Sequence, residues 1–170
     1  MRLVGVVGAT IVALALQTTL DRYVSRGVVA VDFVLVVVVF AALTSGPETG
    51  LLTGAFAGLV QDALSSTGIV GIGGLAKTIV GFFTGIVGTQ FIVAQPLPRF
   101  LVFFGASLLH TFVTVGLYTL LDLRHFGTSY TTAAGQAVGN AAVGVVAFQL
   151  AELLPGAVER RRAAKTRIRR

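Results

Sequence analysis

Long apolar runs with very few charges constrain this chain more than any other feature of its sequence. Charged residues occupy 12% of its 170 positions, whereas a soluble domain carries them at about 25% of positions. A helix needs about 20 apolar residues to cross the roughly 30 Å of hydrocarbon in a bilayer, and several runs approach that length. The chain is therefore predicted to be an integral membrane protein.

The alternation of apolar runs with turn-forming residues predicts an all-α membrane protein with six transmembrane helices. Six spans of about 20 residues fill most of the chain and leave short loops. We expect one six-helix domain over residues 1–156 and a basic cytoplasmic tail over residues 157–170. The predicted spans are residues 3–20, 28–43, 49–64, 69–94, 100–121 and 131–154. Clustered glycines at the start of the fourth predict an irregular stretch, with regular helix from about Leu75.

Basic residues gather at the C-terminal end of the sequence. Seven of the thirteen follow Glu159, namely Arg160, Arg161, Arg162, Lys165, Arg167, Arg169 and Arg170. A basic segment after a membrane helix is typical of contact with the anionic cytoplasmic leaflet, so anionic lipids are the expected partner of this tail and nucleic acid is not. With an even number of spans, both termini are predicted to be cytoplasmic.

Three charged residues inside the predicted spans are the most informative: Asp32, Asp62 and Lys77. A charge in mid-membrane costs about 2.5 to 3.5 kcal/mol unless it is paired or hydrated. In the predicted orientation all three lie toward the outer leaflet. Asp62 and Lys77 stand on either side of a short turn, so the sequence leaves two interpretations, a structural ion pair between them or a site for a partner or ligand.

Glycines spaced by four residues mark one face of the third span. Gly50, Gly54 and Gly58 leave that face without side chains, which lets another helix approach closely. The neighbouring helix inside the chain and a helix of a partner protein are both possible occupants of this face.

Neutral polar residues in the spans are predicted to form hydrogen bonds between helices. They are Gln61, Gln90, Gln136, Asn140 and Gln149. We expect the same of His110, in the fifth span. The sequence has no cysteine, its two histidines are far apart, and no serine carries a nucleophile motif, so no catalytic, cofactor or metal residue is predicted and the chain is not expected to be an enzyme.

A longer pattern resembles the rod shape-determining protein MreD family. It consists of Asp32 before an apolar helix, a Gly46-Pro47 turn, and a glycine-rich helix that ends at Asp62 before a glycine-rich link. The sequence departs from the family at Val31, where proline is often found. Lys77 stands where the family is expected to be neutral, so no family role is assigned to it.

The resemblance implies a noncatalytic scaffold of the bacterial elongation machinery in the plasma membrane. Its implied partner is a bitopic protein of the MreC type, with indirect links to MreB, RodA and a class-B penicillin-binding protein. The implied fold is similar to the substrate-binding subunits of energy-coupling-factor transporters. Candidate contact or structural residues are Asp32, Pro47, Gly50, Gly54, Gly58, Asp62 and Lys77. The alternative is a small-molecule binding subunit of a vitamin-type transporter, for which the sequence is poor in the aromatic residues that line such pockets.

Overall fold

The computed structural model describes residues 2–23, 31–65, 69–91, 95–122 and 130–168, and their regular structure is helical. The helices are α1 (Arg2–Tyr23), α2 (Phe33–Ser45), α3 (Pro47–Leu64), α4 (Ile72–Gln90), α5 (Pro96–Leu120) and α6 (Tyr130–Ile168). The predicted all-helical architecture is confirmed.

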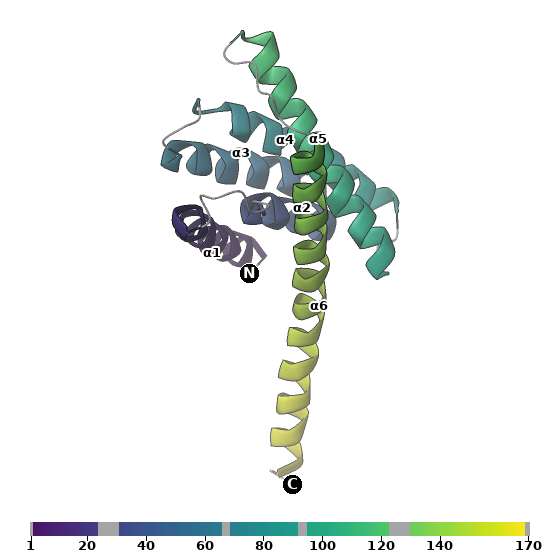
Figure 1. Cartoon of the computed structure of the whole chain (residues 1–170). Helices are drawn as coiled ribbons and strands as arrows, with labels where there is room; N and C mark the ends of the chain where they lie inside the picture. The colour runs from purple at the N-terminus through teal and green to yellow at the C-terminus, as the bar shows by residue number, and fades with distance from the viewer. Residues whose placement is uncertain (1, 24–30, 66–68, 92–94, 123–129, 169–170) are drawn as a thin grey trace.

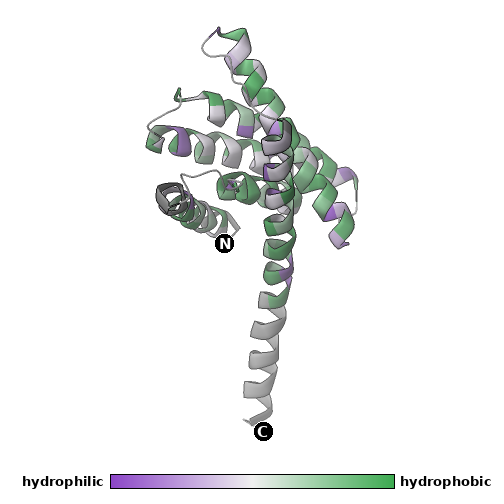
Figure 2. Cartoon of the chain, viewed as in Figure 1, coloured by the Kyte–Doolittle hydropathy of each residue, from purple (hydrophilic) through white to green (hydrophobic). Residues whose placement is uncertain are grey.

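Three helical segments in the described residues are long and apolar enough to cross a membrane. They are Ile72–Gln90, Pro96–Leu120 and Thr131–Leu153, while the apolar segments in α1 and α2 are shorter. Figure 2 shows that apolar residues predominate along α2 to α5. Large apolar side chains point outward, for example Phe112 (76% exposed) and Leu120 (83% exposed). Such a surface suits hydrocarbon, as expected of a membrane protein.

The helices form two groups that cross each other. In Figure 1, α2, α3 and α4 lie side by side, and α5 and α6 pack together and cross them. α2 contacts all five other helices, and most of its residues are buried. On one side its Leu35 and Val39 pack with Phe103 of α5 and Ala141 of α6, which joins the two groups through an apolar core.

Glycine and proline determine how α3 begins. Gly46 has a φ of 91°, a left-handed conformation that favours glycine, and its N–H donates to the carbonyl of Ala42. Pro47 follows as the first residue of α3, where a helix needs no backbone donor. The two residues therefore reverse the chain tightly between α2 and α3.

The starts of the second and fourth helices differ from the sequence prediction. α2 begins at Phe33 and not at residue 28, because Asp32 is its N-cap; residues 28–30 lie outside the described part of the chain. α4 begins at Ile72, directly after Gly71, which has a φ of 108°. The predicted irregular stretch from residue 69 is therefore shorter than expected, and the regular helix starts before Leu75. The predicted end of this span, residues 92–94, also lies outside the described residues.

The last two helices are longer than predicted. α5 starts at Pro96, where proline is again accepted in the first turn. α6 continues past the predicted end at residue 154 to Ile168, and in Figure 1 its final part extends away from the other helices. The segment predicted as a separate tail is thus a continuation of α6 up to Ile168. The candidate tail residues 160–162 and 165 all lie in this part of the helix.

Candidate functional site, a buried polar network

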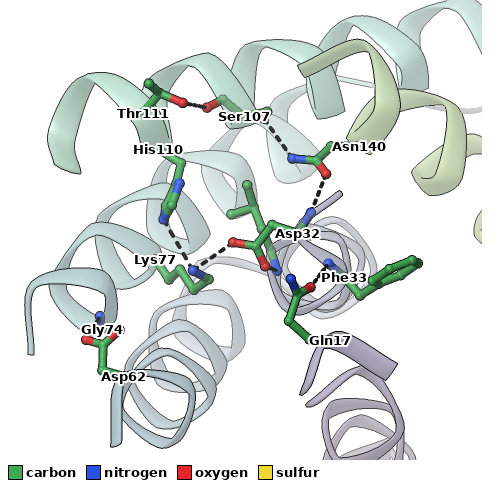
Figure 3. Close-up of polar contacts among 11 residues, drawn as sticks. Gln17, Asp32, Phe33, Asp62, Gly74, Lys77, Ser107, His110, Thr111 and Asn140 are labelled. Carbon is green, nitrogen blue, oxygen red and sulfur yellow. Dashed lines mark hydrogen bonds and ion pairs between the residues drawn. The ribbon is translucent and has the colours of Figure 1, made fainter. Parts of the chain in front are cut away.

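A buried ion pair lies at the start of α2. Lys77 Nζ on α4 is 2.9 Å from Asp32 Oδ2, and the two side chains are 4% and 8% exposed. Figure 3 shows the two groups pointing toward each other between the helices. Because neither charge reaches solvent, each depends on the other for its stability in this environment.

His110 extends this pair to α5. Its Nε2 atom lies 3.3 Å from Lys77 Nζ. A lysine ammonium group can only donate, so the histidine accepts through Nε2 and is neutral in this arrangement. The predicted contact between His110 and a neighbouring helix is confirmed.

Asn140 connects the same point to α6. Its Oδ1 accepts from the backbone N–H of Asp32 at 2.8 Å, and its Nδ2 donates to Ser107 Oγ at 2.8 Å. Asn140 and Ser107 are 1% and 2% exposed. One amide therefore joins α2, α5 and α6, as predicted for Asn140.

Several of the first backbone N–H groups at the start of α2 have acceptors in this network. Asp32 Oδ1 accepts from Leu35 N at 2.9 Å, and Gln17 Oε1 on α1 accepts from Phe33 N at 3.0 Å. A helix start in a nonpolar interior needs such acceptors, because each buried N–H group left unpaired costs about 1–3 kcal/mol. Side chains from α1, α4, α5 and α6 thus converge on one helix terminus.

Asp62 does not pair with Lys77. Its Oδ2 accepts from the N–H groups of Gly71 and Gly74 at 2.9 and 3.0 Å, at the start of α4. The hypothesis of an Asp62–Lys77 ion pair is therefore wrong: Lys77 pairs with Asp32, and Asp62 caps α4 from the end of α3. The negative charge lies at the positive end of a helix, where it is stabilising.

The glycine face of α3 is occupied by α4. A Cβ atom on Gly50 would overlap the backbone of Gly81, and one on Gly54 would overlap the carbonyl of Lys77. Gly58 meets Gly74 in the same way, and Gly85 on α4 meets the backbone of Pro47. Of the two occupants considered for this face, the structure has the neighbouring helix of the same chain.

A second polar contact joins α5 and α6 at the first turn of α5. The Arg99 guanidinium donates to both carboxylate oxygens of Glu152, and it lies 4.6 Å from the ring centroid of Phe148. Arg99 is 5% exposed, whereas the Glu152 side chain is 57% exposed. The pair ties α5 to α6 outside the network.

The four glutamines predicted to bond between helices do not do so in the described part of the chain. Gln61 has a buried Oε1 without a hydrogen-bond partner in the part of the chain that the structure describes. Gln90 and Gln149 are exposed and Gln136 is half-buried, and none of these three bonds to a described residue. Asn140 differs from these glutamines because its amide lies in the core, where it meets both a donor and an acceptor.

The sequence of this chain matches the model of one known protein family. The family model for the rod shape-determining protein MreD matches residues 1–154. The chain belongs to the MreD family. No curated protein and no solved structure matches it. The MreD match includes every residue of the network and of the glycine face, and it confirms the resemblance seen in the sequence. The chain is therefore a rod-shape-determining membrane protein of a family that is not enzymatic.

Sequence reasoning found the charged members of the network but not their pairing. Ser107 and Gln17 were not singled out. Asp32 directly before an apolar run is the usual signature of an N-cap, and it would have indicated that the start of α2 needs acceptors from other helices. No local signal identifies Gln17, because its contact depends on how α1 packs.

Proposed function

We propose that this chain is a noncatalytic membrane scaffold that binds an MreC-type bitopic protein and thereby helps to organise peptidoglycan synthesis. MreB, RodA and a class-B penicillin-binding protein are its indirect partners in this proposal. The family match over residues 1–154 supports it. The function is assembly, and no step in it requires a reacting group.

The use of the buried polar groups is the structural observation that carries the proposal. The polar groups that could line a ligand pocket are Asp32, Asp62, Lys77 and Asn140. Lys77 and Asn140 both contact Asp32 at the start of α2, and Asp62 caps α4. A binding subunit for a vitamin-type molecule would direct several of these groups toward a cavity. Their use in joining helices favours the scaffold over the transporter subunit.

The topology completes this proposal. All six helices cross the plasma membrane, both termini are cytoplasmic, and the fold is similar to that of energy-coupling-factor binding subunits. The basic part of α6 then lies at the anionic cytoplasmic leaflet, where each Lys or Arg contributes about 1 kcal/mol of attraction. A periplasm-active reporter fused to the C-terminus tests this orientation: it is expected to be inactive, and activity would overturn the topology.

Copurification from native membranes tests the partner. The tagged chain, extracted in mild detergent, is expected to retain the single-span MreC-type protein of the same bacterium. The Lys77→Ala variant provides a comparison: losing the buried pair with Asp32 destabilises the fold, so recovery of the partner is expected to fall. Recovery of a bound vitamin or of a pair of ATPase subunits would contradict the scaffold and support the transporter alternative.

A further inference from the structure

The exposed apolar surfaces of α3 and α5 differ in length. α4 contacts both helices, whereas α3 and α5 are not neighbours in the described part of the chain. On α5 the large apolar residues that point outward extend from Leu97 to Leu120. On α3 they are Leu52, Phe56, Leu59 and Leu64. The two surfaces therefore lie on separate sides of the molecule.

Polar groups bound the apolar surface of α3 at both ends. At one end Glu48 is exposed in the first turn, and a Cβ atom added to nearby Gly46 would lie 3.9 Å from Thr89 of α4, which is exposed as well. The polar ends of α3 and α4 thus lie at the same level. At the other end Asp62 is held by two backbone N–H groups at the start of α4, and the exposed Ser65 follows the helix.

The apolar surface between these ends is shorter than the hydrocarbon of a bilayer. Residues 49–64 form a helix of about 24 Å, against roughly 30 Å of hydrocarbon. α5 has 25 residues, or about 37 Å, and a helix that is too long fits by tilting. Tilting α3 only reduces the thickness that it covers. Because the two helix groups cross each other, no single orientation aligns both with the membrane normal (Figure 1).

The polar ends of α3 cannot close this gap of about 6 Å. A carboxylate drawn into hydrocarbon is costly, and Glu48 lacks the long apolar stem that lets Lys and Arg reach the interface. Asp62 is committed to the start of α4. A bilayer thins beside a short helix at a low cost per ångström, so the lipid is the more adaptable of the two.

We propose that the bilayer is thinned where it meets α3, so that this side of the molecule is surrounded by lipids with shorter acyl chains than the α5 side. The proposal rests on the topology proposed above, in which α3 crosses the membrane. The levels of the polar groups favour lipid as the occupant. They coincide on α3 and α4, as the flat boundary of a bilayer requires of adjacent helices and a single partner helix does not.

Tryptophan quenching by brominated lipid tests the proposal, and the absence of tryptophan from the chain makes single-Trp variants clean probes. Phe56→Trp reports on the α3 side and Phe112→Trp on the α5 side, since these residues are 57% and 76% exposed. Each variant is reconstituted in bilayers of a brominated phosphatidylcholine mixed with myristoleoyl, oleoyl or erucoyl phosphatidylcholine. Relief of quenching gives the relative affinity of each lipid. The preferred acyl chain is expected to be shorter at position 56 than at position 112.

The same preferred chain at both positions would overturn the proposal. Absence of quenching at position 56 would overturn it too, because protein and not lipid would then cover α3. The reporter fusion and the copurification are read separately, so a failure of the topology or of the scaffold function is distinguishable from a failure here.

A change at Glu48 tests the cause in the Phe56→Trp background. Glu48→Leu lengthens the apolar surface of α3 by about one turn and is expected to shift the preferred chain at position 56 to a longer one. Glu48→Gln is the matched control, because it keeps a polar group at the same place. An equal preference in the two variants would show that the polar end of α3 does not set the lipid thickness, and the proposal would fall.

Discussion

The α3–α4 contact and the network at the start of α2 hold helices together in opposite ways. Between α3 and α4 the side chains are absent, and Gly50 and Gly54 bring two backbones into direct contact. At α2 the side chains are long and polar, and Lys77, His110 and Asn140 reach across from three helices. Burying apolar surface drives helix association weakly in lipid, so close packing and hydrogen bonding take its place. The difference predicts which kind of substitution each region tolerates.

Removal of Lys77 is expected to have the largest effect. Lys77→Ala leaves Asp32 buried without its counter-charge, and breaking a buried pair in this way costs about 3–5 kcal/mol. The measurement is the free energy of unfolding in detergent micelles, followed by titration with a denaturing detergent.

A double variant separates charge from packing at this pair. Asn at position 32 can still cap α2, so Asp32→Asn combined with Lys77→Met is expected to recover most of the loss, because no buried charge remains. If the double variant is as unstable as Lys77→Ala, the pair does not act through charge.

An added methyl group at Gly54 is expected to be the next most damaging change. The Cβ atom of Gly54→Ala would overlap the carbonyl of Lys77, and overpacking of this kind costs about 1–3 kcal/mol. Gly105→Ala is the control, because the space beside Gly105 is open. Thermal unfolding of both variants compares the two sites, and equal unfolding temperatures would mean that α3 and α4 are not in close contact.

The loss of the Asp62 cap is expected to be smaller. Asp62→Ala removes the acceptor for the N–H groups of Gly71 and Gly74, and loss of an N-cap costs about 0.5–2 kcal/mol. Asp62→Asn should retain most of the stability, since asparagine caps a helix about as well as aspartate. An Asn variant as unstable as the Ala variant would show that the charge itself matters, as the rejected pairing with Lys77 requires.

Asn140 is expected to contribute least among these positions. Asn140→Ala removes hydrogen bonds to Asp32 and Ser107, and such interhelical bonds in membranes average about 0.6 kcal/mol. A double-mutant cycle with Ser107→Ala isolates the bond between the two side chains. A coupling energy of zero would place the whole effect of Asn140 on the backbone of Asp32.

The sequence predicted the helices well, because apolar runs in a membrane protein directly report which segments can be buried in lipid. Their ends were predicted less well, since the start of α2 depends on Asp32 as a cap and that of α4 on the left-handed conformation of Gly71. The continuation of α6 to Ile168 was not predicted, because the apolar run ends near Leu154 and the basic residues beyond it were interpreted as a separate tail.

The site could be predicted in composition but not in pairing. A charge within a membrane span needs a partner, and this rule singled out Asp32, Asp62 and Lys77. Proximity in sequence favoured Asp62 as the partner of Lys77, but in the fold Asp62 lies at the glycine N–H groups that begin α4. Pairing depends on how helices pack, and local spacing contains no information about it. The occupation of the glycine face by α4 depends on packing for the same reason.

The central position of α2 has a consequence for the bilayer. Thirteen residues form a helix of about 20 Å, shorter than the roughly 30 Å of hydrocarbon. A helix of that length in contact with lipid would force the bilayer to thin around it or the helix to draw polar flanks inward. α2 is surrounded by the other five helices, and the acceptors at its first turn come from them. Its length is therefore matched to its protein neighbours, and membranes of different thickness leave it undisturbed.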